Sequence, residues 1–226
     1  MNGASLEESL GILVRTVLEH QDDGVRCAFY MADPAGSALR HLVGMPERYA
    51  LCVDGLRIGP DSFACGLAVH LGEAVITPDV ALEPRWQPWM WMAHEHGFQG
   101  VWSFPVKTFG GRVGATFAMY FRQPRTPVPR DHELAAVMTR SAGIIIARAQ
   151  EAEERARAEH ALRESEERLR RFGEASQDVL WIRDADTLQW SYLTQAFEPV
   201  YGLPRAHALA GADTFAAWLD LVLPID

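Results

Sequence analysis

Apolar residues recur at helical spacing close to the start of the chain. Ser5 and Glu8 stand three residues apart just before this pattern, as in a capping box, where the serine accepts from the amide three residues on and the glutamate reaches back. The apolar positions at three- and four-residue spacing are Leu6, Leu10, Leu13, Val14 and Val17. They predict an amphipathic helix that begins after Ser5 and ends before Gly24.

Short apolar runs between turn residues predict the strands. Residues 25–32 form one such run, and residues 39–43 return after a turn at 33–36 that holds Pro34 and Gly36. Residues 74–77 form a third run. The side chains expected on one face of the first strand are Cys27, Phe29 and Met31.

A second hairpin is predicted further along the chain. Residues 100–109 and 112–121 are apolar runs joined by a Gly-Gly pair, which is typical of a tight hairpin. Pro105 has no backbone N–H to donate, so it is expected at a bulge or on the open side of its strand.

The remaining segments predict helices. A short helix followed by a loop is expected within residues 46–61, and further helices at 62–71 and 84–97. A long helix begins at Pro129 and continues to Gly173. This order predicts the α+β class, with one antiparallel sheet flanked by helices and a long connecting α-helix.

The second half of that long helix is dominated by charge. Of the 24 residues from Arg148 to Arg171, 14 are Arg or Glu. Two thin stripes of small and apolar residues run along it, one residue out of phase: 145, 149, 152 and 156, then 158, 162, 165, 169 and 172. Such a helix is either a solvated spacer or one strand of a coiled coil. We expect a parallel homodimer through residues 145–172.

Composition and charge exclude several classes of protein. The chain has 226 residues and a net charge of −9, which does not suit binding to nucleic acid or to an anionic membrane surface. No apolar run reaches the length of a membrane span, and no secretory signal pattern opens the chain. Three widely spaced cysteines suit neither a disulfide framework nor a zinc site. These features predict a cytoplasmic protein.

Six motifs together resemble the GAF sensory domain of bacterial multidomain sensors, of the histidine kinase or diguanylate cyclase type. The resemblance implies a domain at residues 1–147 that senses a small ligand or a partner. The motifs are 63–66 (FACG), 72–80 (GEAVITPDV), 83–86 (EPRW), 93–98 (AHEHGF), 101–106 (VWSFPV) and 114–120 (GATFAMY).

Later motifs resemble the first half of a PAS domain. They are 162–170 (LRESEERLR), 178–184 (DVLWIRD), 196–203 (AFEPVYGL) and 218–226 (WLDLVLPID). The resemblance implies a signalling helix at 148–172 and a partial PAS domain at 173–226, within a longer sensor whose output domain is not in this chain. Half a domain is expected to leave Trp190, Phe215 and Trp218 poorly covered.

Several residues are candidates for chemistry. Cys65 is interpreted as a small buried hydrophobe, a ligand contact, or a redox or attachment site. Pairing of Cys52 with Cys65 would make the domain an oxidoreductase similar to free methionine sulfoxide reductases. No Cys-His dipeptide accompanies Cys65, so a bilin is not expected. His94 and His96 point apart if helical, so structure is favoured over metal binding, and no metal is expected.

The resemblance and the strand faces together imply a ligand pocket of unknown occupant. Its expected lining is Cys65, Trp86, Trp89, His96, Trp102, Ser103, Phe117 and Met119. We expect a sensory module without catalytic activity of its own. The alternatives are a structural dimerisation module without a ligand and, less favoured, the cysteine-based oxidoreductase.

Overall fold

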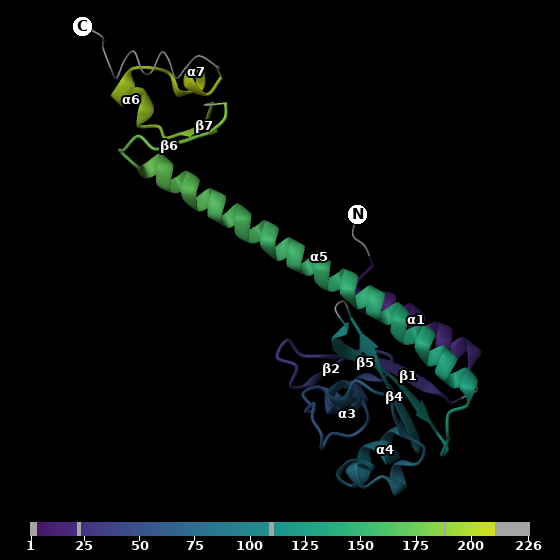
Figure 1. The fold of residues 1–226 in the computed structure, drawn as a ribbon. Coiled ribbons are helices and arrows are strands. Elements are labelled where there is room, and N and C mark those ends of the chain that lie inside the picture. Colours follow the sequence, from purple (N-terminus) through teal and green to yellow (C-terminus); the bar gives the residue numbers. More distant parts are fainter. Residues whose placement is uncertain (1–3, 22–23, 109–110, 188, 211–226) are drawn as a thin grey trace. The chain divides into compact units, whose positions relative to one another are not determined.

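The computed structural model describes residues 4–21, 24–108, 111–187 and 189–210. The chain forms two compact units, Met1–Glu153 and Glu154–Asp226. One helix, α5 (Pro129–Ala175), passes from the first unit into the second. Figure 1 shows the elements and their order along the chain.

The first unit is built on an antiparallel sheet of five strands in the order β2-β1-β5-β4-β3. Its strands are β1 (Arg26–Ala32), β2 (Leu39–Val43), β3 (Val75–Thr77), β4 (Gly100–Lys107) and β5 (Val113–Phe121). Each predicted strand is confirmed, with ends shifted by at most two residues. The tip of the β4–β5 hairpin, 109–110, lies outside the described residues. Pro105 lies in the part of β4 that extends past β3, because the last pair between these strands is Val75 with Ser103. The edge of β4 that would need its N–H is therefore not paired with β3 at this position.

Helices cover both faces of this sheet. They are α1 (Leu6–His20), α2 (Glu47–Val53), α3 (Ala64–Leu71), the 3₁₀ helices η1 (Val80–Leu82) and η2 (Pro84–Trp89), α4 (Met90–His96) and α5. The capping box predicted for α1 is present, because the Ser5 hydroxyl accepts from the Glu8 amide and the Glu8 carboxylate accepts from the Ser5 amide. The single helix expected at 84–97 divides into η2 and α4, since Pro88 has no N–H to bond one turn back.

One face of the sheet packs against α1 and the first part of α5, which lie along it in Figure 1. Leu10, Val14 and Val17 of α1 enter this core, as do Met138 and Ile146 of α5. The strand residues that meet them are Cys27, Phe29, Trp102, Phe104, Val106, Ala115, Phe117, Met119 and Phe121. The opposite face is covered by α2, α3, η2 and α4.

The start of α5 is fixed to the sheet by a buried carboxylate. Asp131 is 3% exposed and accepts from the Arg125 guanidinium at 2.9 Å and from the Val128 amide at 2.9 Å. The same guanidinium lies over the rings of Trp102 and Phe121, 5.3 Å and 4.9 Å from their centroids. Asp131 therefore ties the first turn of α5 to the edge of the core.

The second unit contains the end of α5 and four short elements. These are β6 (Trp181–Arg183), β7 (Trp190–Leu193), α6 (Phe197–Tyr201) and α7 (Arg205–Ala210), with β6 and β7 paired antiparallel. Trp190 is 6% exposed and packs with Leu193 and Phe197. The expectation that Trp190 is poorly covered is therefore wrong, because α6 and α7 close over it. Phe215 and Trp218 lie outside the described residues.

None of the helices within the described part of the chain combines the length and apolar character needed to cross a bilayer. The α+β class, the antiparallel sheet and the long helix are confirmed.

Replacing either of two helical glycines by alanine is expected to change the stability of the fold, in opposite directions. A Cβ at Gly143 would overlap the Lys107 carbonyl oxygen, where α5 crosses the end of β4, whereas a Cβ at Gly11 of α1 meets nothing closer than 3.5 Å. Gly143→Ala is expected to lower the free energy of unfolding by about 1–3 kcal/mol through overpacking. Gly11→Ala is expected to raise it by up to about 1 kcal/mol through helix propensity. Urea denaturation measures both, and equal effects would contradict the close approach at Gly143.

Candidate functional site

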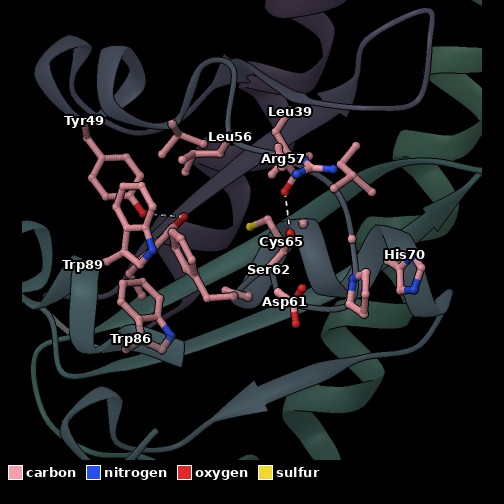
Figure 2. Close-up of a pocket in the computed structure, with 18 residues that line it drawn as sticks. Leu39, Tyr49, Leu56, Arg57, Asp61, Ser62, Cys65, His70, Trp86 and Trp89 are labelled. Carbon is pink, nitrogen blue, oxygen red and sulfur yellow. Dashed lines mark hydrogen bonds between the residues drawn. The ribbon is translucent and has the colours of Figure 1, made fainter. Parts of the chain in front are cut away.

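A cavity of about 360 Å³ lies on the face of the sheet opposite α1 and α5. It is lined by α2, α3, η2 and the loop that leads into α3 (Figure 2). Tyr120 of β5 contributes to the lining from the sheet, which we call the base of the cavity. Its lining combines aromatic rings with a few polar groups. The lining residues are Leu39, Tyr49, Val53, residues 56–66, His70, Trp86, Trp89 and Tyr120.

The loop before α3 is held close to that helix. Gly66 has no room for a side chain, because a Cβ there would lie 2.7 Å from the Arg57 carbonyl oxygen and 2.9 Å from the Ser62 Cβ. The Ser62 hydroxyl also donates to the Arg57 carbonyl oxygen. Ala64, at the first turn of α3, has φ +41°, a backbone conformation that favours glycine. Close packing therefore holds this wall of the pocket in place.

Three aromatic rings of the lining pack together, Phe63 from the loop before α3 and Trp86 and Trp89 from η2. Phe63 packs against both indoles, with its centroid 4.5 Å from that of Trp86 and 5.1 Å from that of Trp89. Trp86 is fully buried, while Phe63 and Trp89 are half-buried. The buried indole N–H of Trp86 has no hydrogen-bond partner within the described residues.

Hydroxyl groups cover the sheet beneath the cavity. The Tyr49 hydroxyl donates to that of Tyr120 at 3.2 Å, and the hydroxyls of Tyr120 and Tyr30 are 2.8 Å apart. Beside them, the Cys65 Sγ lies 3.0 Å from the Ser103 Oγ. We call these five residues the hydroxyl floor.

Burial keeps the phenol and thiol groups of the hydroxyl floor uncharged. Desolvation raises the pKa of Tyr30, Tyr49 and Tyr120 well above the ordinary phenol value, and it also raises the pKa of the Cys65 thiol. The thiolate is the nucleophilic form of cysteine, so the raised pKa of Cys65 disfavours redox or covalent chemistry at neutral pH.

Charged side chains occur only at the mouth. Arg57, Asp61 and His70 are the ionisable side chains of the lining other than the tyrosines and Cys65, and all three are exposed. In Figure 2 they lie on the side away from Tyr49, Trp86 and Trp89. The site therefore has an apolar, uncharged interior and a polar entrance, an arrangement typical of small-molecule pockets.

The structure brings together part of the predicted lining. Cys65, Trp86 and Trp89 line the cavity, and Ser103 lies beneath it in contact with Cys65. His96 does not line the cavity, but its ring lies edge-on to that of Tyr49, with the centroids 4.9 Å apart.

Three predicted lining residues belong elsewhere. Trp102, Phe117 and Met119 point to the other face of the sheet and pack against α1 and α5. The Trp102 indole N–H donates to the Arg125 carbonyl oxygen on that side, at 3.0 Å. Side chains alternate along a strand, so Trp102 and Ser103 cannot face the same layer.

The two tyrosines of the lining were not among the predicted site residues. In β5 the residues that alternate with Phe117 and Met119 are Thr116, Ala118 and Tyr120, and these face the pocket layer, so choosing this alternate set would have found Tyr120. Tyr49 had no comparable signal, because only the packing of α2 on the sheet brings it to Tyr120.

The other ionisable candidates have structural environments. Nowhere in the described ranges do three or more His, Cys, Asp or Glu side chains cluster as metal ligands would. His94 is exposed on α4, and the carbonyl oxygen of His96 accepts from the Arg26 guanidinium at 2.8 Å. The Cys27 thiol is buried in the core against α1, where desolvation raises its pKa to about 12.

One known protein similar to this chain is named as a sensor. The methyl sulfide methyltransferase-associated sensor of Methanosarcina acetivorans is 29% identical over an alignment of 212 residues, and the match covers 92% of this chain and 20% of the relative. The chain thus spans about a fifth of the length of this curated relative.

Solved structures with the same fold include domains of two larger proteins. A domain of a protein described as a two-component sensor histidine kinase, from Sinorhizobium meliloti 1021, is 18% identical with a TM-score of 0.55, and the match covers 68% of this chain and 99% of that one. The GAF domain of a phosphoenolpyruvate-protein phosphotransferase from Coxiella burnetii is 15% identical with a TM-score of 0.54, over 67% of this chain and 88% of that one.

The family model described as GAF domain matches residues 3–147, which is more than half of the chain. The matched range contains the whole five-stranded sheet, both helical layers and the cavity. By this match and by its fold, the chain belongs to the GAF domain family.

Proposed function

We propose that this chain is the sensory part of a longer signalling protein, in which the GAF domain binds a small molecule and α5 carries the change to the next module. Membership of the GAF family and a relative named as a sensor support a sensory or regulatory role. The observation that carries the proposal is the cavity itself. It is aromatic and uncharged inside, and the buried Trp86 N–H on its wall has no partner within the described residues.

The sheet supplies a route from the pocket to α5. Tyr120 of β5 contacts the cavity, and its neighbour Met119 packs in the core on the α5 side. On that side, Ala142 and Ile146 of α5 are fully buried. A ligand that changes the position of β5 would therefore change the packing of α5, and it shifts a two-state equilibrium by its differential affinity for the two states.

We further propose that α5 pairs with a second copy of itself through residues 145–172. Every residue from 151 to 166 is exposed within the described chain, including Leu162 at 61%, and Leu169 further along is 64% exposed. Ion pairs between Arg155 and Glu159, and between Arg163 and Glu167, link successive turns. Exposed pairs of this kind contribute little, so an apolar seam against a partner helix is the better source of stability for so long a helix.

We assign the second unit to the PAS module that follows the GAF domain. We assign the longer protein to the histidine kinase or diguanylate cyclase type. We assign the chain to the cytoplasm, since its three cysteines are free thiols. We also propose that it acts by binding and not by catalysis, because burial disfavours the reactive form of Cys65.

Ligand binding is tested by melting temperature in the presence of fractionated metabolite pools. The melting temperature of the unaltered chain is expected to rise with the concentration of an active fraction, because a ligand at 100 times its Kd stabilises the folded state by about 2.7 kcal/mol. Trp89→Ala removes a ring from the pocket wall and is expected to abolish the rise. Trp91→Ala, an exposed tryptophan outside the lining, is the control and should retain it. If no fraction shifts the unaltered chain, the alternative of a ligand-free dimerisation module is favoured.

Dimerisation is tested by light scattering. The unaltered chain is expected at twice its mass of 25.2 kDa, and Leu162→Glu is expected to shift it to the monomer by placing a charge in the apolar seam. His160→Glu places a glutamate two residues away, on the side of the helix opposite the second stripe, and should leave the dimer intact. If the unaltered chain is a monomer at high concentration, the coiled-coil assignment is wrong.

Thiol labelling at pH 7.5 tests the absence of cysteine chemistry. Cys52 is partly exposed and is expected to react first. Cys27 and Cys65 are buried and their pKa values are raised, so each is expected to react at least about tenfold more slowly than in the unfolded chain. Cys52→Ser should remove the fast phase. Fast labelling of Cys65 in the folded protein would instead favour the oxidoreductase.

A further inference from the structure

We propose that the pocket selects a flat, uncharged aromatic heterocycle that offers a hydrogen-bond acceptor to the indole N–H of Trp86. The inference rests on the proposed function of the cavity as a ligand site and names the chemical class of its occupant. Three features of the site carry it: an unused donor, aromatic walls and a neutral interior.

The unused donor is the most specific of these features. The Trp86 indole is fully buried, and its N–H finds no acceptor among the residues that the structure describes. An indole N–H can only donate, so the missing partner has to be an acceptor such as a carbonyl oxygen or a ring nitrogen. Buried donors are nearly always paired in folded proteins. His96 Nε2 and the Thr116 hydroxyl are also buried without a partner in the described chain, but Trp86 is the one of these three residues that lines the cavity, where a ligand could supply the partner.

The walls favour a flat aromatic occupant. Phe63 lies against both Trp86 and Trp89, with interplanar angles of 59° and 37°. Tyr49 and Tyr120 add two more rings from the base of the cavity. Aromatic groups pack on such surfaces in offset or edge-to-face contact.

The interior favours an uncharged occupant. No buried side chain of the lining carries a charge, and burying an unpaired charge is very unfavourable. Desolvation raises the pKa values of Tyr49, Tyr120 and Cys65, which keeps their groups neutral at ordinary pH. Any ionic substituent of the ligand is therefore left at the mouth, where Arg57 and Asp61 are exposed (Figure 2).

Access to the donor requires a side chain to move. Trp86 has no exposed surface, whereas Phe63 and Trp89 beside it are only half-buried. We place this movement in the rings of Phe63 and Trp89. When one of them moves away from Trp86, the ligand takes its place, accepts the hydrogen bond from the Trp86 N–H and stacks on the remaining ring.

The test compares two probes of the same shape, quinoxaline and naphthalene. Quinoxaline has two acceptor nitrogens at positions where naphthalene has C–H groups. Equilibrium dialysis gives the ratio of quinoxaline affinity to naphthalene affinity for the full chain and for Trp86→Phe. The substitution removes the donor and is expected to lower this ratio about threefold to tenfold, because only quinoxaline can accept from the Trp86 N–H. Trp91→Phe, on an exposed tryptophan outside the lining, should leave the ratio unchanged.

Proton–nitrogen NMR of the unaltered chain gives an answer even if Trp86→Phe folds poorly. Quinoxaline is expected to move the Trp86 indole N–H resonance downfield, and naphthalene is not. The Trp102 indole, already bonded to the Arg125 carbonyl on the other face of the sheet, is the internal control and should stay in place.

Two results would overturn the proposal: a ratio of quinoxaline affinity to naphthalene affinity that Trp86→Phe leaves unchanged, or no binding of quinoxaline. Failure here is distinguishable from failure of the proposed function. If metabolite fractions still raise the melting temperature and Trp89→Ala still abolishes the rise, the pocket is a sensor site and only the class of its ligand is wrong.

Discussion

The alternation of side chains along β4 and β5 is the constraint on which the rest of the structure depends. These two strands lie inside the sheet and are covered on both faces. Trp102 and Phe117 build the core beneath α1 and α5, while their neighbours Ser103 and Thr116 face the pocket layer. Because the period is two residues, a shift by one position would exchange the helix-bearing core with the pocket base. The position of α5 and the chemistry of the cavity are set by the same register.

The two faces of the five-stranded sheet are stabilised in different ways. The α5 face is a core of aliphatic and aromatic side chains, bordered by an ion pair between the buried Asp131 and the partly exposed Arg125. The pocket face buries hydroxyl and thiol groups, and these remain acceptable there because they bond to one another. Three groups depart from this pattern within the described chain: the Trp86 N–H, the Thr116 hydroxyl and His96 Nε2. Of these three residues, Trp86 lines the cavity.

Local sequence signals were sufficient for most elements and for part of the site. The Ser5–Glu8 capping box, the turn before β2 and the unbroken pattern after Pro129 depend on near neighbours, and each element followed as predicted. The helix expected at 84–97 divided at a proline, a signal that was visible in the sequence. The pocket list failed where it took adjacent strand residues for one face, as with Trp102 beside Ser103.

The sequence by itself determined the class of fold, the family and the long charged helix, because spacing, turn residues and motifs act over a few positions. Only the tertiary structure decided which face of the sheet bears the pocket. It also decided that Tyr30, Tyr49 and Tyr120 meet there, and that Trp190 is covered. Tyr30 and Tyr120 are 90 residues apart in the chain. Contacts of that separation follow from strand register and helix packing, which local periodicity does not encode.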